Sequence, residues 1–128
     1  MKTSYFGNIL KIKAPLSISS RAPIWYNGPQ FKALAPKYEF FSAYKAGELN
    51  IEGYISEFDR LVLAQLDPKT IYDQLQITHG PDVSLLCYEK PGEFCHRRLV
   101  ARWFETELGV SVPELVWEPP KDHGLLYY

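Results

Sequence analysis

The stretch VSLLCYEKPGEFCHRR, residues Val83–Arg98, decides the fold of this chain. Its first five residues, Val83–Cys87, have the length and apolar composition of a strand that is buried on both faces. The polar residues that follow include Pro91 and Gly92 and have the chemistry of a turn, and a helix is predicted from Phe94. In a parallel α/β sheet, such a loop lies at the carboxyl end of its strand, where these folds bind ligands. We therefore expect the functional site at this corner.

Three further segments favour strands. Thr3–Ile9 is rich in β-forming residues, and Leu16–Ser20 alternates apolar residues with serines. Near the end of the chain, Val112–Trp117 reads as a strand that Pro113 confines to a sheet edge. These segments and the central strand predict a mostly parallel sheet of about four strands.

Four segments favour helices. One runs from Pro36 toward Gly47, a second follows the capping residue Asn50 to Leu66, and a third begins at Pro68 after the cap Asp67 and ends before His79. The fourth spans Phe94–Leu108 and stops at Gly109. Right-handed crossovers would place such helices on both faces of the sheet. The expected fold is a small three-layer, Rossmann-like α/β domain.

Composition limits the class of protein. The 128 residues fit one domain, 1–128, with an irregular proline-rich tail from about 118. Apolar residues make up 46% and charged residues 23%, which argues against wholesale disorder. The net charge of −1 argues against a general nucleic-acid coat but leaves room for a local basic pocket. The chain has neither a signal-peptide pattern nor an apolar run of membrane-spanning length, so we expect a cytoplasmic protein without a membrane partner.

Cys95, His96 and Arg97 are the strongest candidates for chemistry. We predict Cys95 in the first turn of its helix, where free backbone N–H groups and neighbouring positive charges favour a thiolate. Arg97 would then hold an anion beside those N–H groups, and Glu89 would serve as a general acid or base. The structural alternative is a small buried cysteine that packs the helix onto the sheet, with an arginine in a surface ion pair.

A second cluster follows the Leu16–Ser20 strand. Ser20 and Arg21 come at the strand exit, and the loop after them carries Trp25 and Tyr26 between two prolines. A basic residue with neighbouring aromatic rings suits a ligand that has both a phosphate and a base. Arg21 would bind the phosphate, and Trp25 or Tyr26 would stack on the base.

Metal binding and disulfide formation are weaker alternatives for the cysteines. Cys87, Cys95, His96 and His79 could supply ligands, but the chain has no paired C-x2-C or H-x3-H spacing. We therefore predict no metal and no cofactor. Two cysteines in a cytosolic protein are expected to be reduced rather than bridged. Neither cysteine fits the loop of a cysteine phosphatase, since the sixth residue on is Glu93 or Ala101 rather than arginine.

The run LLCYEKPGEFCHRRLVARWFE resembles the signature of the domain of unknown function 488 family, in which an LLC(Y/F)EK strand end precedes a CHR helix start. This resemblance implies a compact intracellular α/β fold found in bacteria and their phages. Where the family has an acid two residues before its first arginine, this chain has Ser19. The matched positions are Arg21, Cys87, Glu89, Cys95, His96 and Arg97.

These observations leave three hypotheses. The first is an enzyme, or a former enzyme, that acts on a phosphate-bearing small molecule such as a nucleotide or on a nucleic-acid end. The second is a non-catalytic module of phage or host defence that binds a nucleotide or a protein. The third is a redox sensor that uses Cys87 and Cys95. The oligomeric state does not follow from the sequence.

Overall fold

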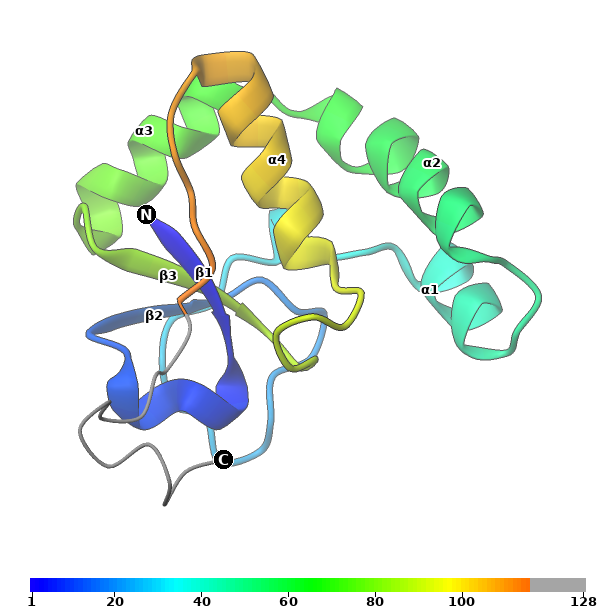
Figure 1. Cartoon of the computed structure of the whole chain (residues 1–128), viewed down its shortest axis with the longest axis horizontal. Helices are drawn as coiled ribbons and strands as arrows, with labels where there is room; N and C mark the ends of the chain where they lie inside the picture. The colour runs from blue at the N-terminus through cyan, green and yellow to red at the C-terminus, as the bar shows by residue number, and fades with distance from the viewer. Residues whose placement is uncertain (116–128) are drawn as a thin grey trace, which may run out of the picture.

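The computed structural model describes residues 1–115, which fold around a three-stranded parallel sheet (Figure 1). The strands are β1 (Lys2–Tyr5), β2 (Ala14–Ser17) and β3 (Val83–Cys87), in the order β1-β3-β2. All five residues of β3 are buried, as expected for the central strand. In the register, Tyr5 pairs with Cys87 and Ser17 pairs with Leu86, so the three strands end at the same edge.

The outer strands differ from their predicted bounds. The predicted Thr3–Ile9 strand stops at Tyr5, and the next residues form the 3-10 helix η1 (Phe6–Lys11). Because β3 ends at Cys87, the residue paired with Tyr5, a longer β1 would have no neighbour to pair with. The predicted Leu16–Ser20 strand begins earlier, at Ala14, and includes Pro15, which an edge strand can accommodate.

The fourth strand is not confirmed. Within the described part of Val112–Trp117, Glu114 makes only an isolated parallel bridge with Thr3. The Thr3 N–H donates to the Pro113 carbonyl at 3.0 Å, and the Leu115 N–H donates to the Thr3 carbonyl at 2.7 Å. The remainder of this segment and the tail predicted from about 118 lie outside the described residues.

The helices lie where the sequence predicts them, although the second, expected to run to Leu66, ends at Leu61 before a 3-10 turn. They are α1 (Tyr38–Lys45), α2 (Ile51–Leu61), α3 (Pro68–His79) and α4 (His96–Leu108), with short 3-10 turns η2 (Lys32–Leu34) and η3 (Leu63–Gln65). The Asn50 side chain accepts a hydrogen bond from the Gly53 N–H at 2.8 Å, and Asp67 accepts one from the Thr70 N–H at 2.8 Å, so both predicted caps are present. Gly109 ends α4 in a left-handed conformation, φ 68°.

The three-layer arrangement is not confirmed. Side chains from all four α-helices join Leu16, Val83 and Leu85 in one buried cluster, which lies on one side of the sheet. The opposite face carries a small cluster of Phe6, Tyr26 and Leu86, covered by η1 and the loop after β2 (Figure 1). The fold is therefore mixed α/β, with its core between the sheet and the α-helices. Within residues 1–115, no helix has the length and apolarity needed to cross a membrane.

Candidate functional site

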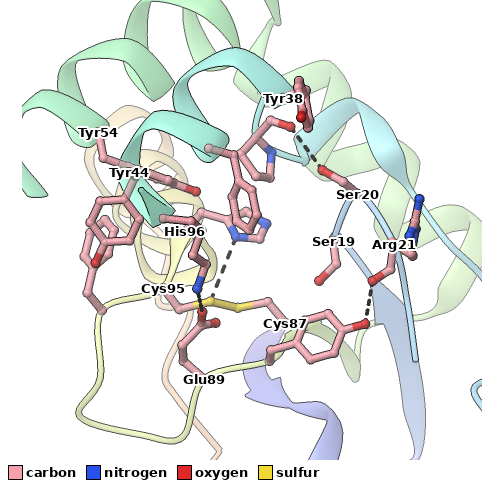
Figure 2. A pocket seen from close by; sticks show the side chains of 15 residues that line it. Ser19, Ser20, Arg21, Tyr38, Tyr44, Tyr54, Cys87, Glu89, Cys95 and His96 are labelled. Carbon is pink, nitrogen blue, oxygen red and sulfur yellow. Dashed lines mark hydrogen bonds and ion pairs between the residues drawn. A yellow bond between two sulfur atoms is a disulfide. The ribbon is translucent and has the colours of Figure 1, made fainter. Parts of the chain in front are cut away.

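A cavity of about 460 Å³ opens at the carboxyl ends of β2 and β3 (Figure 2). Six of the predicted site residues line it: Ser20, Arg21, Cys87, Glu89, Cys95 and His96. They come from segments about 70 residues apart in sequence. The strand exit after β2 and the start of α4 thus contribute to a common cavity.

Two hydrogen bonds join these distant segments. The Tyr88 hydroxyl donates to the Arg21 carbonyl at 2.6 Å, just beyond the end of β3. Deeper in the site, His96 Nε2 lies 2.8 Å from the Ile18 carbonyl oxygen. Because a carbonyl oxygen only accepts hydrogen bonds, Nε2 carries the proton and Nδ1 is left unprotonated.

The unprotonated Nδ1 of His96 faces Cys95, with 3.9 Å between Nδ1 and Sγ. Burial lowers the pKa of His96 to about 4, and the nearby Arg97 charge acts in the same direction, although the hydrogen bond to Ile18 partly opposes this shift. The imidazole is consequently neutral at physiological pH. A neutral imidazole nitrogen beside a thiol can accept its proton or coordinate a metal ion.

Cys95 occupies the N-cap of α4 rather than its first turn, with an extended backbone at φ −152°. Its sulfur lies within bonding distance of the Cys87 sulfur, and the two residues form a disulfide (Figure 2). The expectation of two reduced thiols was therefore wrong for this structure. The pairing arises because the end of β3 and the start of α4 face each other across an eight-residue separation.

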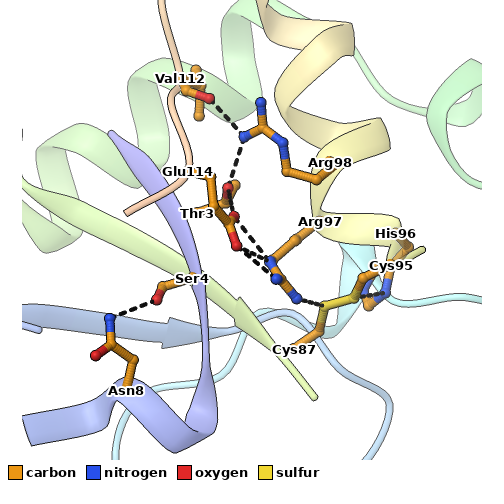
Figure 3. Close-up of polar contacts among 10 residues, drawn as sticks. All are labelled: Thr3, Ser4, Asn8, Cys87, Cys95, His96, Arg97, Arg98, Val112 and Glu114. Atoms are coloured by element: carbon orange, nitrogen blue, oxygen red, sulfur yellow. Dashed lines mark hydrogen bonds and ion pairs between the residues drawn. A yellow bond between two sulfur atoms is a disulfide. The ribbon is translucent and has the colours of Figure 1, made fainter. Parts of the chain in front are cut away.

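Arg97 does not face the cavity. Its side chain is 1% exposed and bonds to Glu114 through Nε and Nη2, with a shortest distance of 2.6 Å (Figure 3). Its Nη1 donates to Cys87 Sγ at 3.1 Å. The predicted anion contact at Arg97 is thus replaced by an ion pair that lies beneath the two sulfurs.

Trp25 and Tyr26 also lie elsewhere. Both rings pack around Phe6, with ring centroids 6.3 Å and 5.3 Å from it, on the face of the sheet opposite the main core. The Tyr26 hydroxyl donates to the Pro29 carbonyl at 2.7 Å. Tyr26 is buried on the thin side of the sheet, whereas Trp25 is 53% exposed at the edge of this cluster, and neither ring lines the cavity.

Other aromatic residues form the cavity wall, and the sequence reading missed them. They come mainly from α1 and α2, whose amphipathic patterns predicted only core positions: Tyr38, Phe41, Tyr44, Tyr54 and Phe94. Burial, with a smaller contribution from the Glu89 charge, raises the pKa of Tyr54. Tyr54 therefore keeps its proton at any physiological pH.

Polar groups around the cavity mouth complete the site. Lys45 Nζ lies 3.8 Å from a Glu89 carboxylate oxygen, so α1 meets the loop after β3. Ser19 lines the cavity and is 5% exposed, and its buried Oγ has no hydrogen-bond partner among the described residues. Ser19 occupies the position at which the resemblance in sequence led us to expect an acid, so a neutral hydroxyl replaces a carboxylate there.

Comparison with known proteins places the chain in a family. Residues 10–108 match a family model described as "Active DUF488-N3 subclade", which spans β2 through α4 and includes every residue of the cavity. Neither the curated proteins nor the solved structures contain a significant match. The match covers most of the sequence and confirms the resemblance seen at the CHR segment. The chain belongs to the domain of unknown function 488 family.

Proposed function

We propose that this protein is an enzyme that acts on a phosphate-bearing ligand, either a nucleotide or the end of a nucleic acid. The observation that carries the proposal is the cavity in which Arg21 and two serines meet the Cys95 and His96 side chains. Binding and reactive groups are thus gathered at the edge where parallel sheets bind ligands. The word "Active" in the description of the matched family model is in keeping with catalysis.

The two ends of such a ligand would meet different walls of the cavity. Arg21 would supply a guanidinium for the phosphate, and Ser19 Oγ, which has no partner among residues 1–115, would donate a further hydrogen bond. Tyr38 and Phe41 from α1 supply ring surface for a base in place of Trp25 and Tyr26. This division would use both the aromatic and the polar residues that line the cavity.

The reactive groups would be those on the opposite wall. Once the disulfide to Cys87 is reduced, Cys95 would present a thiol beside the His96 imidazole, a nitrogen base that the Ile18 carbonyl orients. Glu89, partly exposed at the mouth, is placed to transfer a proton to or from a bound ligand. A ligand phosphate near Arg21 would face this wall directly.

Binding and turnover are tested separately. Calorimetric titration with adenosine mono-, di- and triphosphate and with a 5′-phosphorylated oligonucleotide should identify at least one ligand. Arg21→Ala should weaken its binding by about tenfold or more, because a charge-assisted hydrogen bond is lost. The matched control is Arg60→Ala, which removes an exposed guanidinium of α2 paired with Glu57.

Turnover is followed by chromatography of the same mixtures. Loss of products in Cys95→Ser and Glu89→Gln, with binding retained, supports an enzyme. Binding without any turnover in the wild type would instead indicate the non-catalytic module. Equal affinity of the wild type and Arg21→Ala for every ligand would overturn the proposed site.

One observation favours a second function, which is redox sensing. Cys87 and Cys95 form a disulfide in this structure, which is the state that such a sensor would reach on oxidation. Two thiols would lose two electrons and two protons to form the disulfide, and the peroxide would be reduced to water or an alcohol. Thiol alkylation and mass measurement before and after treatment with hydrogen peroxide and then a phosphine would reveal such a cycle.

A further inference from the structure

We infer that Cys87, Cys95 and His96 bind a zinc ion in the reduced protein. Two thiol sulfurs and one imidazole nitrogen from these residues all lie within 4.8 Å of one another, and all three residues are buried. Two thiolates and an imidazole are a donor set that zinc prefers. The inference is independent of the proposed phosphate ligand because it rests only on these donor atoms and their surroundings.

The backbone spacing suits a metal between the sulfurs. The Cα atoms of Cys87 and Cys95 are 7.1 Å apart, beyond the usual range of about 4.4–6.8 Å across a disulfide. Two thiolates bound tetrahedrally to one zinc ion at about 2.3 Å lie about 3.8 Å from each other. Once reduced, the two side chains can turn apart to that separation without moving the strand or the helix toward each other.

The hydrogen bonds behind the donors are those of a metal site. Ligand histidines usually donate their second ring N–H to a carbonyl or carboxylate, which directs the other nitrogen at the metal. His96 does this with the Ile18 carbonyl at 2.8 Å. Arg97 Nη1 donates to Cys87 Sγ at 3.1 Å, which would stabilise a thiolate ligand.

Charge also balances in this buried position. A zinc ion with two thiolates and one neutral imidazole has no net charge, so its burial avoids the cost of an isolated ion. The adjacent Arg97 charge is already offset by Glu114, whose carboxylate lies 2.6 Å from Nη2. The site would therefore add no uncompensated charge to the core.

The position of the cluster leaves one coordination site open. Cys87, Cys95 and His96 all line the cavity, so a fourth ligand would come from that side. Three protein ligands with one open position are typical of catalytic rather than purely structural zinc. His79, the other histidine weighed from the sequence, lies at the end of α3 and is not part of the cluster.

The test uses the full chain, reduced with a phosphine, stripped with a chelator and desalted without oxygen. Titration with Co²⁺, a spectroscopic substitute for Zn²⁺, should give thiolate-to-cobalt charge-transfer absorption and tetrahedral d–d bands that saturate at one metal per chain. Added Zn²⁺ should displace the cobalt and bleach these bands. Absence of the charge-transfer band in the reduced wild type would overturn the inference, whatever the variants do.

Variants identify the ligands. Cys87→Ser, Cys95→Ser and His96→Ala should each weaken Zn²⁺ binding by a hundredfold or more in a competition assay with a chromophoric chelator, and His79→Ala should leave it unchanged. Circular dichroism shows which variants remain folded. Metal binding that persists in folded variants of both cysteines would place the ion elsewhere and contradict the proposal.

Three further outcomes separate this inference from the proposed function and from redox sensing. A protein that resists reduction and keeps its disulfide would exclude both the metal site and the reversible redox function. Phosphate-ligand binding by the metal-free protein that still depends on Arg21 would leave the proposed function standing if zinc fails. Binding of one zinc ion per chain without binding of any nucleotide would support the zinc site and contradict the proposed function.

Discussion

The Nε2 atom of His96 donates a 2.8 Å hydrogen bond to the carbonyl of Ile18, 78 residues earlier in the chain. This contact fixes the tautomer of the imidazole and directs Nδ1 at the Cys95 sulfur. It also joins the start of α4 to the residue that follows β2. The reactive side of the cavity therefore depends on a long-range backbone contact as much as on the CHR segment.

Burial of His96 should make the metal-free protein less stable in mild acid. Its pKa falls from 6.5 in the unfolded chain to about 4 in the fold, so between these values the unfolded chain binds more protons. The stability associated with His96 is complete above pH 6.5 and declines as the pH falls toward 4. Between pH 7 and pH 5 the loss should be about 2 kcal/mol in urea denaturation.

The variant His96→Gln isolates this effect, because its amide can still donate to the Ile18 carbonyl but does not titrate. Between pH 7 and pH 5, the free energy of unfolding of this variant should fall by about 2 kcal/mol less than that of the wild type. His79→Gln, at the end of α3, serves as the control. An identical pH dependence for wild type and His96→Gln would show that the imidazole is not buried in its neutral form.

The Arg97–Glu114 pair should be important for stability. Removal of the carboxylate in Glu114→Ala leaves a buried guanidinium without its counter-charge, which typically costs about 3–5 kcal/mol. The exposed Arg60–Glu57 pair provides the contrast, and Glu57→Ala should change stability by less than about 1 kcal/mol. Urea denaturation at neutral pH would measure the change in the free energy of unfolding for both variants. Equal effects of the two substitutions would contradict the burial described for Arg97.

Ser19→Ala should separate stability from binding. Because the buried Ser19 hydroxyl has no partner among the described residues, its removal should leave the free energy of unfolding unchanged or raise it by up to about 1 kcal/mol. Affinity for the phosphate-bearing ligand should fall about threefold to tenfold. In Ser20→Ala, a hydroxyl that donates to the Pro36 carbonyl at 3.1 Å is lost, so this control should be destabilised. A clear loss of stability in Ser19→Ala would mean that the hydroxyl is satisfied within the protein.

Glu89→Gln should affect turnover far more than stability. Within residues 1–115, the carboxylate forms a 3.8 Å, partly exposed ion pair with Lys45, worth less than about 1 kcal/mol. If Glu89 transfers a proton during the reaction, the amide should lower kcat by about a hundredfold or more. Glu93→Gln, in the same loop, is the matched control for the charge change. An unaltered kcat in Glu89→Gln would show that Glu89 does not transfer a proton in the reaction.

The sequence determined the central strand, the helices with two of their caps, and the corner at which the cavity lies. The strand Val83–Cys87, the caps Asn50 and Asp67 and the stop at Gly109 were all recognisable, because local chain chemistry specifies them. The CHR segment indicated the family, which the match over residues 10–108 confirmed. These features depend on residues close together in the chain.

Only the tertiary structure decided which side chains share the cavity. Arg97 looked like an anion ligand until Glu114, 17 residues later, was seen to occupy its guanidinium. Trp25 became a packing residue because it meets Phe6, and the aromatic wall came instead from α1 and α2. The physical reason is that hydrophobic and ionic partners are chosen by proximity in the folded chain, which depends on strand register and helix placement rather than on local pattern.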